Sequence, residues 1–196
     1  MWFSRPRLPD DVASLLAIAP DERLLAAGAL ADGGWAAATS ARIVHVLAAR
    51  ATGSAEPERR ADEEDHAGEA GGASSSRGVQ SRPWHDVDRA KFDPATGLLR
   101  ITWVDQAPAW RLHPVDPRKS KIPQAVRDRV EASVVHAEEL SLPGNRTARV
   151  AVRRDADGAM FSQVLAGTGV DLDDPQIVHL IDAAEDRARA AAGLPN

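Results

Sequence analysis

Short apolar segments separated by turn residues make up the first part of the chain. In residues 8–19, proline and two aspartates precede apolar residues spaced three and four apart, which predicts a short helix that ends at Pro20. Strands are expected over residues 23–30, 34–39 and 42–47, the first two joined by a glycine turn. The pattern indicates a helix followed by a strand-rich region.

Residues 52–82 contain almost no side chain that a core could bury. They include four consecutive acidic residues at 62–65 and a glycine- and serine-rich run at 71–76. Because such a segment cannot offset the entropy of ordering it, we predict that it is disordered. Strand-like sequence resumes on its far side, so the segment is interpreted as an insertion within one domain.

A second group of strands is expected after this insertion. Strand-like sequence opens at residues 83–87 and continues over 89–92. A turn at 93–97, with proline after aspartate and glycine at its end, leads into a strand over 98–104. A further short strand is expected over residues 109–113.

Two amphipathic stripes mark the rest of the chain. Between residues 120 and 139, apolar positions at helical spacing with charges on the opposite face predict one long helix. Strands are expected over 148–154 and 159–165, and a second basic cluster, Arg146, Arg149, Arg153 and Arg154, is expected to sit mostly on the solvent side of the first. A closing helix is expected between Asp174, as its N-cap, and Gly193.

These elements predict an α+β protein in three parts. Residues 1–20 hold the short helix, residues 21–140 form one domain with the insertion at 52–82, and residues 141–196 form a ββα unit.

About six short strands followed by a long helix resemble the layout of bacterial pleckstrin-homology-like (PH-like) proteins, and in particular an actinobacterial group of them. The resemblance covers roughly residues 20–140. Three segments carry it: Asp21-Glu22-Arg23-Leu24-Leu25, Pro83-Trp84-His85-Asp86-Val87-Asp88, and the helix from Val126 to Ala137. It implies a strongly bent antiparallel barrel capped by the long helix, and it implies no catalytic activity. Eukaryotic relatives bind phosphoinositides through a basic loop between the first two strands, but here that loop, residues 31–34, has one acid and no base.

Composition narrows the chemistry further. Hydrophobic residues make up 43% of the 196 residues, enough to build a core. The chain has no cysteine, which excludes disulfides, thiolate metal ligands and a cysteine nucleophile. Its net charge of −5 is not typical of nucleic-acid-binding proteins, so no nucleic acid partner is expected. No apolar run resembles a secretory signal or a membrane span, so we expect the protein to be cytoplasmic.

No motif predicts catalysis, a metal or a cofactor. The six histidines include no pair at the spacing of helical metal ligands. Residues 85–88 (His-Asp-Val-Asp) carry acid/base groups, but a surface strand with Trp84 packed inward is the favoured interpretation. Residues 167–169 (Gly-Thr-Gly) lack the lysine of a phosphate loop, and the acids within 171–174 lack the glycine and glutamate of a calcium loop.

One candidate binding site is a basic cluster expected at the start of the long helix: Arg118, Lys119, Ser120 and Lys121. With the free N–H groups of the first helical turn, this cluster could hold a phosphate or an anionic head group. The alternative is a solvated basic face.

A second candidate is the set of tryptophans in predicted strands: Trp35, Trp84, Trp103 and Trp110. They are most simply the core of the domain, although one or two could line a ligand pocket.

The leading hypothesis is therefore a non-catalytic module that binds another protein. The alternatives are a binder of anionic lipid or phosphate groups through the basic cluster, and a small-molecule binder with a tryptophan-lined pocket.

Overall fold

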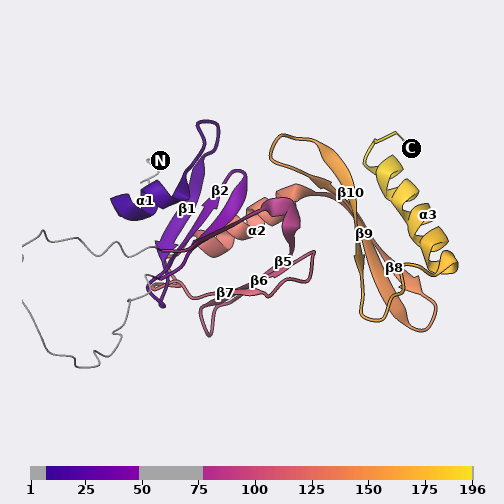
Figure 1. The fold of residues 1–196 in the computed structure, drawn as a ribbon, viewed down its shortest axis with the longest axis horizontal. Helices are drawn as coiled ribbons and strands as arrows, with labels where there is room; N and C mark the ends of the chain where they lie inside the picture. The colour runs from indigo at the N-terminus through magenta and orange to yellow at the C-terminus, as the bar shows by residue number, and fades with distance from the viewer. Residues whose placement is uncertain (1–7, 49–76, 196) are drawn as a thin grey trace, which may run out of the picture.

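The computed structural model describes residues 8–48 and 77–195 (Figure 1). They form three antiparallel sheets and three α-helices, which confirms the α+β class. Within these residues the strand orders are β1-β2-β3-β4, β5-β6-β7 and β10-β9-β8, so no single sheet closes into a barrel. Residues 52–76 of the predicted insertion lie outside the described residues.

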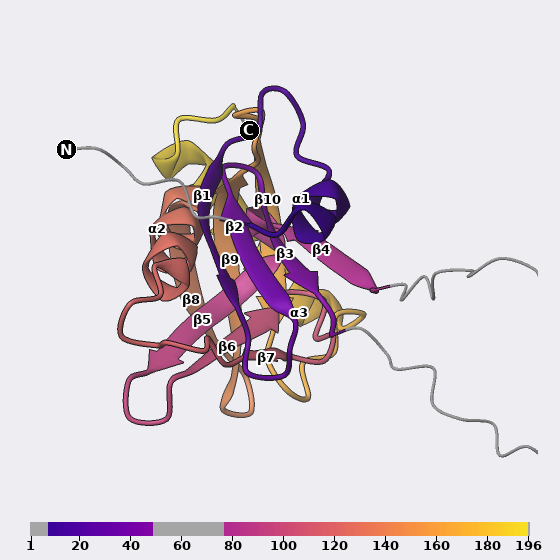
Figure 2. The ribbon, with the colours of Figure 1, turned by 90° about the vertical axis from the view of Figure 1, so that its left-hand side faces the viewer.

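The first sheet and the helix that covers it come from the N-terminal half of the chain (Figure 2). They are α1 (Asp10–Leu16), β1 (Leu24–Ala29), β2 (Trp35–Thr39), β3 (Arg42–Val46) and β4 (Val79–Pro83). The structure confirms the predicted helix and the first three strands. It contradicts the disorder predicted for residues 79–82, which pair antiparallel with β3 as part of β4. The free edge of β3 offers backbone partners that a polar segment can use without burying its side chains.

The second sheet follows a single turn of 3-10 helix, η1 (Trp84–Asp86). Its strands are β5 (Val87–Asp93), β6 (Leu98–Trp103) and β7 (Trp110–Leu112), with the predicted hairpin turn between β5 and β6. The prediction that a strand opens at residues 83–87 is therefore wrong, because Trp84–Asp86 form η1. The chain changes direction there to pass from one sheet to the next.

The long helix is the largest correction to the sequence-based prediction. α2 spans Ile122–Ser133, and at Val134 the chain passes directly into β8 (Val134–Leu142). The predicted domain boundary at residue 140 thus falls inside a strand. Two adjacent β-branched residues open β8, and its pairing with β9 (Arg146–Arg154) prevails over the helical spacing of its apolar residues.

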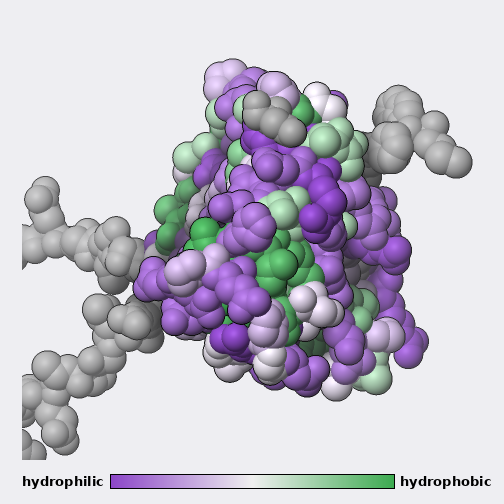
Figure 3. Space-filling model, turned by 90° about the vertical axis from the view of Figure 1, so that its right-hand side faces the viewer, coloured by the Kyte–Doolittle hydropathy of each residue, from purple (hydrophilic) through white to green (hydrophobic). Residues whose placement is uncertain are grey.

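The C-terminal unit is consequently βββα rather than ββα. β8, β9 and β10 (Met160–Ala166) form a sheet, and α3 (Pro175–Ala191) packs on one face of it. Asp174 is the N-cap as predicted, since its Oδ1 accepts a hydrogen bond of 2.9 Å from the Gln176 N–H. The face of the molecule that carries α3 is mostly polar around a compact apolar area (Figure 3).

Three apolar clusters hold these layers together. The largest lies between the first two sheets and α2, the second lies beneath α3, and a small one lies beneath α1. No helix among residues 8–48 and 77–195 is long and apolar enough to cross a membrane.

Candidate functional site

Among residues 8–48 and 77–195, no strand pairs with the outer edge of β4, which ends the first sheet. The Leu47 N–H donates to the Gly78 carbonyl at 2.8 Å, and bonded and non-bonded pairs alternate from that point along an antiparallel ladder. In this register Val79 and Ser81 occupy non-bonded pairs, so their N–H and C=O groups point away from β3. Pro83, which has no N–H, falls at the next outward position. β4 therefore offers backbone donors and acceptors to a further strand.

A groove with a volume of about 460 Å³ runs beside this edge. It is lined by residues 80–82 of β4, by Trp103, and by residues 107–110 at the start of β7. The rings of Trp103 and Trp110 meet edge to face, with centroids 4.8 Å apart at 79°. Trp103 is buried and Trp110 is half-buried, which gives the groove a rigid aromatic wall.

Arg82 fixes the β4 side of the groove. Its guanidinium lies 4.5 Å from the centroid of the Trp103 ring and pairs with Asp105 at 2.7 Å and Asp86 at 3.1 Å. The hydrogen bond to Asp105 is the main reason that the pKa of Arg82 is raised. Because two carboxylates already balance this charge, Arg82 shapes the groove rather than offering a free cation.

His45 lies behind the aromatic wall. Its ring centroid is 5.4 Å from that of Trp110, and both ring nitrogens are buried without a partner among the described residues. Burial lowers the pKa of His45, and the charge of Asp32 and the nearby Gln80 side chain, which makes no well-formed hydrogen bond with the ring, oppose this shift only in part. The lowered pKa favours the neutral imidazole, so His45 places no charge behind Trp110.

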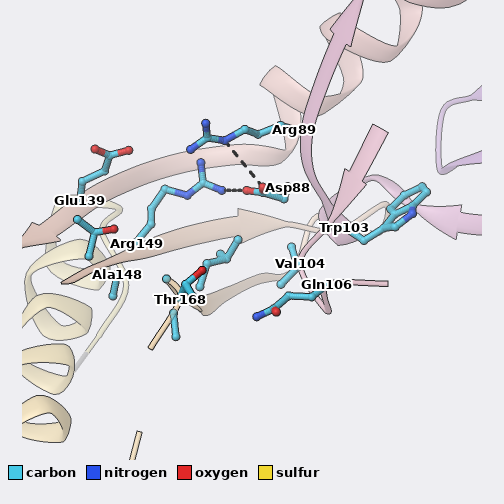
Figure 4. Close-up of a pocket in the computed structure, with 13 residues that line it drawn as sticks. Asp88, Arg89, Trp103, Val104, Gln106, Glu139, Ala148, Arg149 and Thr168 are labelled. Carbon is cyan, nitrogen blue, oxygen red and sulfur yellow. Dashed lines mark hydrogen bonds and ion pairs between the residues drawn. The ribbon is translucent and has the colours of Figure 1, made fainter. Parts of the chain in front are cut away.

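A second pocket, of about 280 Å³, lies between the second sheet and the C-terminal sheet (Figure 4). Asp88 forms an ion pair with Arg149 there, and Arg89 lies 3.8 Å from the same carboxylate. These charges satisfy one another, so the pocket is best explained as a polar junction between two layers. Gly167 and Thr168 line the pocket, and the Gly167 N–H donates to the Thr147 carbonyl at 2.8 Å.

Arg153 contradicts the prediction that the arginines of β9 face solvent. It is 1% exposed and donates to the Ser133 Oγ at 2.9 Å and to the Val87 carbonyl at 2.7 Å. Burial lowers the pKa of Arg153, as does the nearby charge of Arg149. Arg149 and Arg153 share the face of β9 that meets α2 and β5, whereas Arg154, which points to the other face, is exposed. The sequence did not predict these buried hydrogen bonds from β9 to α2 and β5.

The predicted basic cluster lies in the loop before α2: Arg118, Lys119, Ser120 and Lys121. Lys119 pairs with Asp116 at 3.1 Å, and the Ser120 Oγ accepts from the Ile122 N–H at 3.3 Å. Pro123 removes another N–H from the first turn. The structure thus places a carboxylate beside the cluster and leaves few free donors there. Anion binding by this cluster stays a prediction.

The four predicted tryptophans fall at three places in the structure. Trp103 and Trp110 come together in the groove, whereas Trp35 packs beside the small cluster under α1. Trp84 lies in the main core, where its indole N–H donates to the Thr39 carbonyl at 3.0 Å. Sequence reasoning missed the free edge of β4, because that segment was expected to be disordered.

The acid/base groups of residues 85–88 do not assemble into a metal site. No group of three or more His, Asp or Glu side chains suited to a metal occurs in the part of the chain that the structure describes. Asp86 pairs with Arg82 and Asp88 pairs with Arg149, so both carboxylates have structural partners.

Comparisons with known proteins leave the function to be argued from the chain's own residues. No family model, no curated protein and no solved structure matches the chain.

Proposed function

We propose that this chain is a non-catalytic protein-binding module that takes an extended segment of its partner along the free edge of β4. The observation that carries the proposal is the position of the outward-facing backbone groups of Val79 and Ser81 directly beside the groove lined by Trp103 and Trp110. Backbone hydrogen bonds would supply affinity, and the aromatic groove would supply selectivity.

The geometry also indicates which partner sequences fit. Side chains of neighbouring strands that lie opposite each other point to the same face of a sheet. Gln80 and Arg82 face the groove, so every second side chain of an added strand would face it as well. The preferred partner is an extended segment with apolar or aromatic residues at alternate positions.

The same proposal includes a PH-like architecture for the first two sheets and α2. Four strands, three strands and a helix follow one another in the order that the resemblance implies, and α2 packs against β1, β2 and β5. A bridge between Leu30 and Pro114 joins the two sheets at one corner. In this proposal the sheets form a bent barrel that is open at β4, where the partner adds.

Selection of peptides from a displayed random library tests the proposal. Peptides enriched on the wild-type protein should carry alternating apolar residues and should bind at least about tenfold more weakly to Ser81→Pro, which removes an outward N–H. Proline is tolerated at such an edge position, so the fold should persist, as circular dichroism would check.

Ser81→Ala is the matched control. Both substitutions remove the hydrogen bond of 3.2 Å between the Arg42 Nη1 and the Ser81 Oγ, but alanine keeps the backbone N–H. Equal binding of the selected peptides to the proline and alanine variants would contradict strand addition at β4.

A further inference from the structure

We infer that the chain has an oxyanion site, separate from the β4 groove, in a pocket where the end of α2 meets η1 and the β9–β10 turn. The pocket has a volume of about 210 Å³ and is lined by the side chains of His85, Arg129 and Arg154, among others. It shares no lining residue with the β4 groove. Its ligand is a phosphate or another small tetrahedral oxyanion.

The state of Arg129 is the first observation for this site. Its Nε is buried and has no hydrogen-bond partner among the described residues. Nor does any described carboxylate lie within ion-pair distance of its guanidinium, whereas Arg127, two residues earlier on α2, pairs with Glu131 at 2.8 Å. A buried, charged N–H that lacks an acceptor is costly, so the pocket calls for an acceptor that the described residues do not supply.

Local charge is the second observation. Arg154, an exposed residue that also lines the pocket, has no carboxylate partner in the described part of the chain. The buried Arg153 donates to Ser133, which lines the same pocket. Asp155 is the one acid in the lining, and its Oδ1 is engaged by the N–H groups of Asp157 at 3.0 Å and Ala159 at 2.8 Å. The lining of this pocket therefore has more basic than acidic side chains, which favours an anion. Arg129 also lines an adjoining pocket that holds Asp21, Glu22 and Asp157, and Glu22 there is paired with Arg42.

Size and donor geometry select the class of ligand. Pockets for whole organic ligands usually measure about 300–1,000 Å³, so this pocket suits a single small group. Guanidinium groups bind phosphate oxygens through paired N–H donors, and Arg129 and Arg154 offer two such forks from different elements. His85, held edge to face against Phe161 at 5.1 Å, adds a third polar side chain.

Nuclear magnetic resonance of the full chain tests this inference with inorganic phosphate as the probe, at constant ionic strength set by chloride. The Nε–H resonance of Arg129 should shift in a saturable manner, and that of Arg127 should not. Arg129→Gln and Arg154→Gln should each weaken phosphate binding by about tenfold or more, while the matched control Arg127→Gln should leave it unchanged. Arg129→Lys, which keeps the charge but loses the fork, should also bind more weakly.

A phosphate group could arrive free or on a lipid, and a second arm separates the two sources. Phosphatidylcholine vesicles with and without phosphatidic acid are mixed with wild type, Arg129→Gln and Arg127→Gln. Arg129-dependent binding to the acidic vesicles would support the site and assign it to a lipid head group; binding of inorganic phosphate alone would support a free anion. An Arg129 resonance that does not respond in either arm, or equal behaviour of the two glutamine variants, would overturn the inference.

Discussion

Replacing Asp88 with asparagine should destabilise the protein far more than the same change at Asp116. Asp88 lies at the junction between two layers, where its side chain is 21% exposed and that of its partner Arg149 is 23% exposed. Asp88→Asn would leave Arg149 partly buried without a carboxylate, beside the buried charge of Arg153. The pair between Asp116 and Lys119, by contrast, is 48% and 87% exposed.

The expected magnitudes follow from this difference in exposure. Breaking a fully buried ion pair by removing one partner costs about 3–5 kcal/mol. Because both members of the Asp88–Arg149 pair keep about a fifth of their exposure, solvent screens part of that cost, and we expect a loss of about 2–3 kcal/mol in the free energy of unfolding. Exposed pairs contribute at most about 1 kcal/mol, so Asp116→Asn should cost less than that.

Urea unfolding at pH 7, followed by tryptophan fluorescence, measures both variants. Asp88→Asn should lower the midpoint clearly with an unchanged m-value, and Asp116→Asn should move it little. Equal midpoints, or a more stable Asp88→Asn protein, would refute the reasoning that the junction depends on this carboxylate.

Three further changes test other parts of the structure. Asp174→Ala should lower the free energy of unfolding by about 1 kcal/mol through loss of the α3 cap, as measured in urea. Gly167→Ala should cost about 1–3 kcal/mol, because an added Cβ would lie 2.5 Å from the Thr147 carbonyl oxygen; a melting temperature equal to that of wild type would contradict this. Burial keeps the pKa of His45 in the folded state below 6.5, the ordinary pKa of histidine. As the pH falls below 6.5, the unfolded state therefore binds the proton first, and the free energy of unfolding should decrease. Above that pH, His45 should have little effect on the free energy of unfolding. Unfolding curves between pH 5 and 8 should show this acid-side loss in wild type and a smaller one in His45→Gln.

Local patterns in the sequence were sufficient for the elements whose side chains face a single core. α1, β1–β3 and α3 lie where apolar spacing and turn residues indicated, and the N-cap at Asp174 is in place. In each of these elements local propensity and burial point to the same structure.

The errors arise where long-range pairing decides the structure. The local sequence of β8 predicts the continuation of a helix, but pairing with β9 makes it a strand. The local sequence of residues 79–82 predicts disorder, but hydrogen bonds with the edge of β3 make it part of β4. Arg153 was expected on the solvent side of β9, but α2 and β5 cover the face on which it lies, and no local pattern reveals that second layer.

The candidate site was predictable only in part, for the same reason. Trp103 and Trp110 were candidates for lining a pocket, and the structure brings them together in the groove. The other wall of the groove is β4, which lies mostly within the segment that the sequence predicted to be disordered.

Amide hydrogen exchange, followed residue by residue on the wild-type protein with and without a selected peptide, tests strand addition at β4 most directly. The free protein should exchange the outward amides of Val79 and Ser81 quickly, and the bound protein should exchange them much more slowly, because a new strand would accept hydrogen bonds from both. Unchanged exchange at Val79 and Ser81 in a saturated complex would contradict the proposed function.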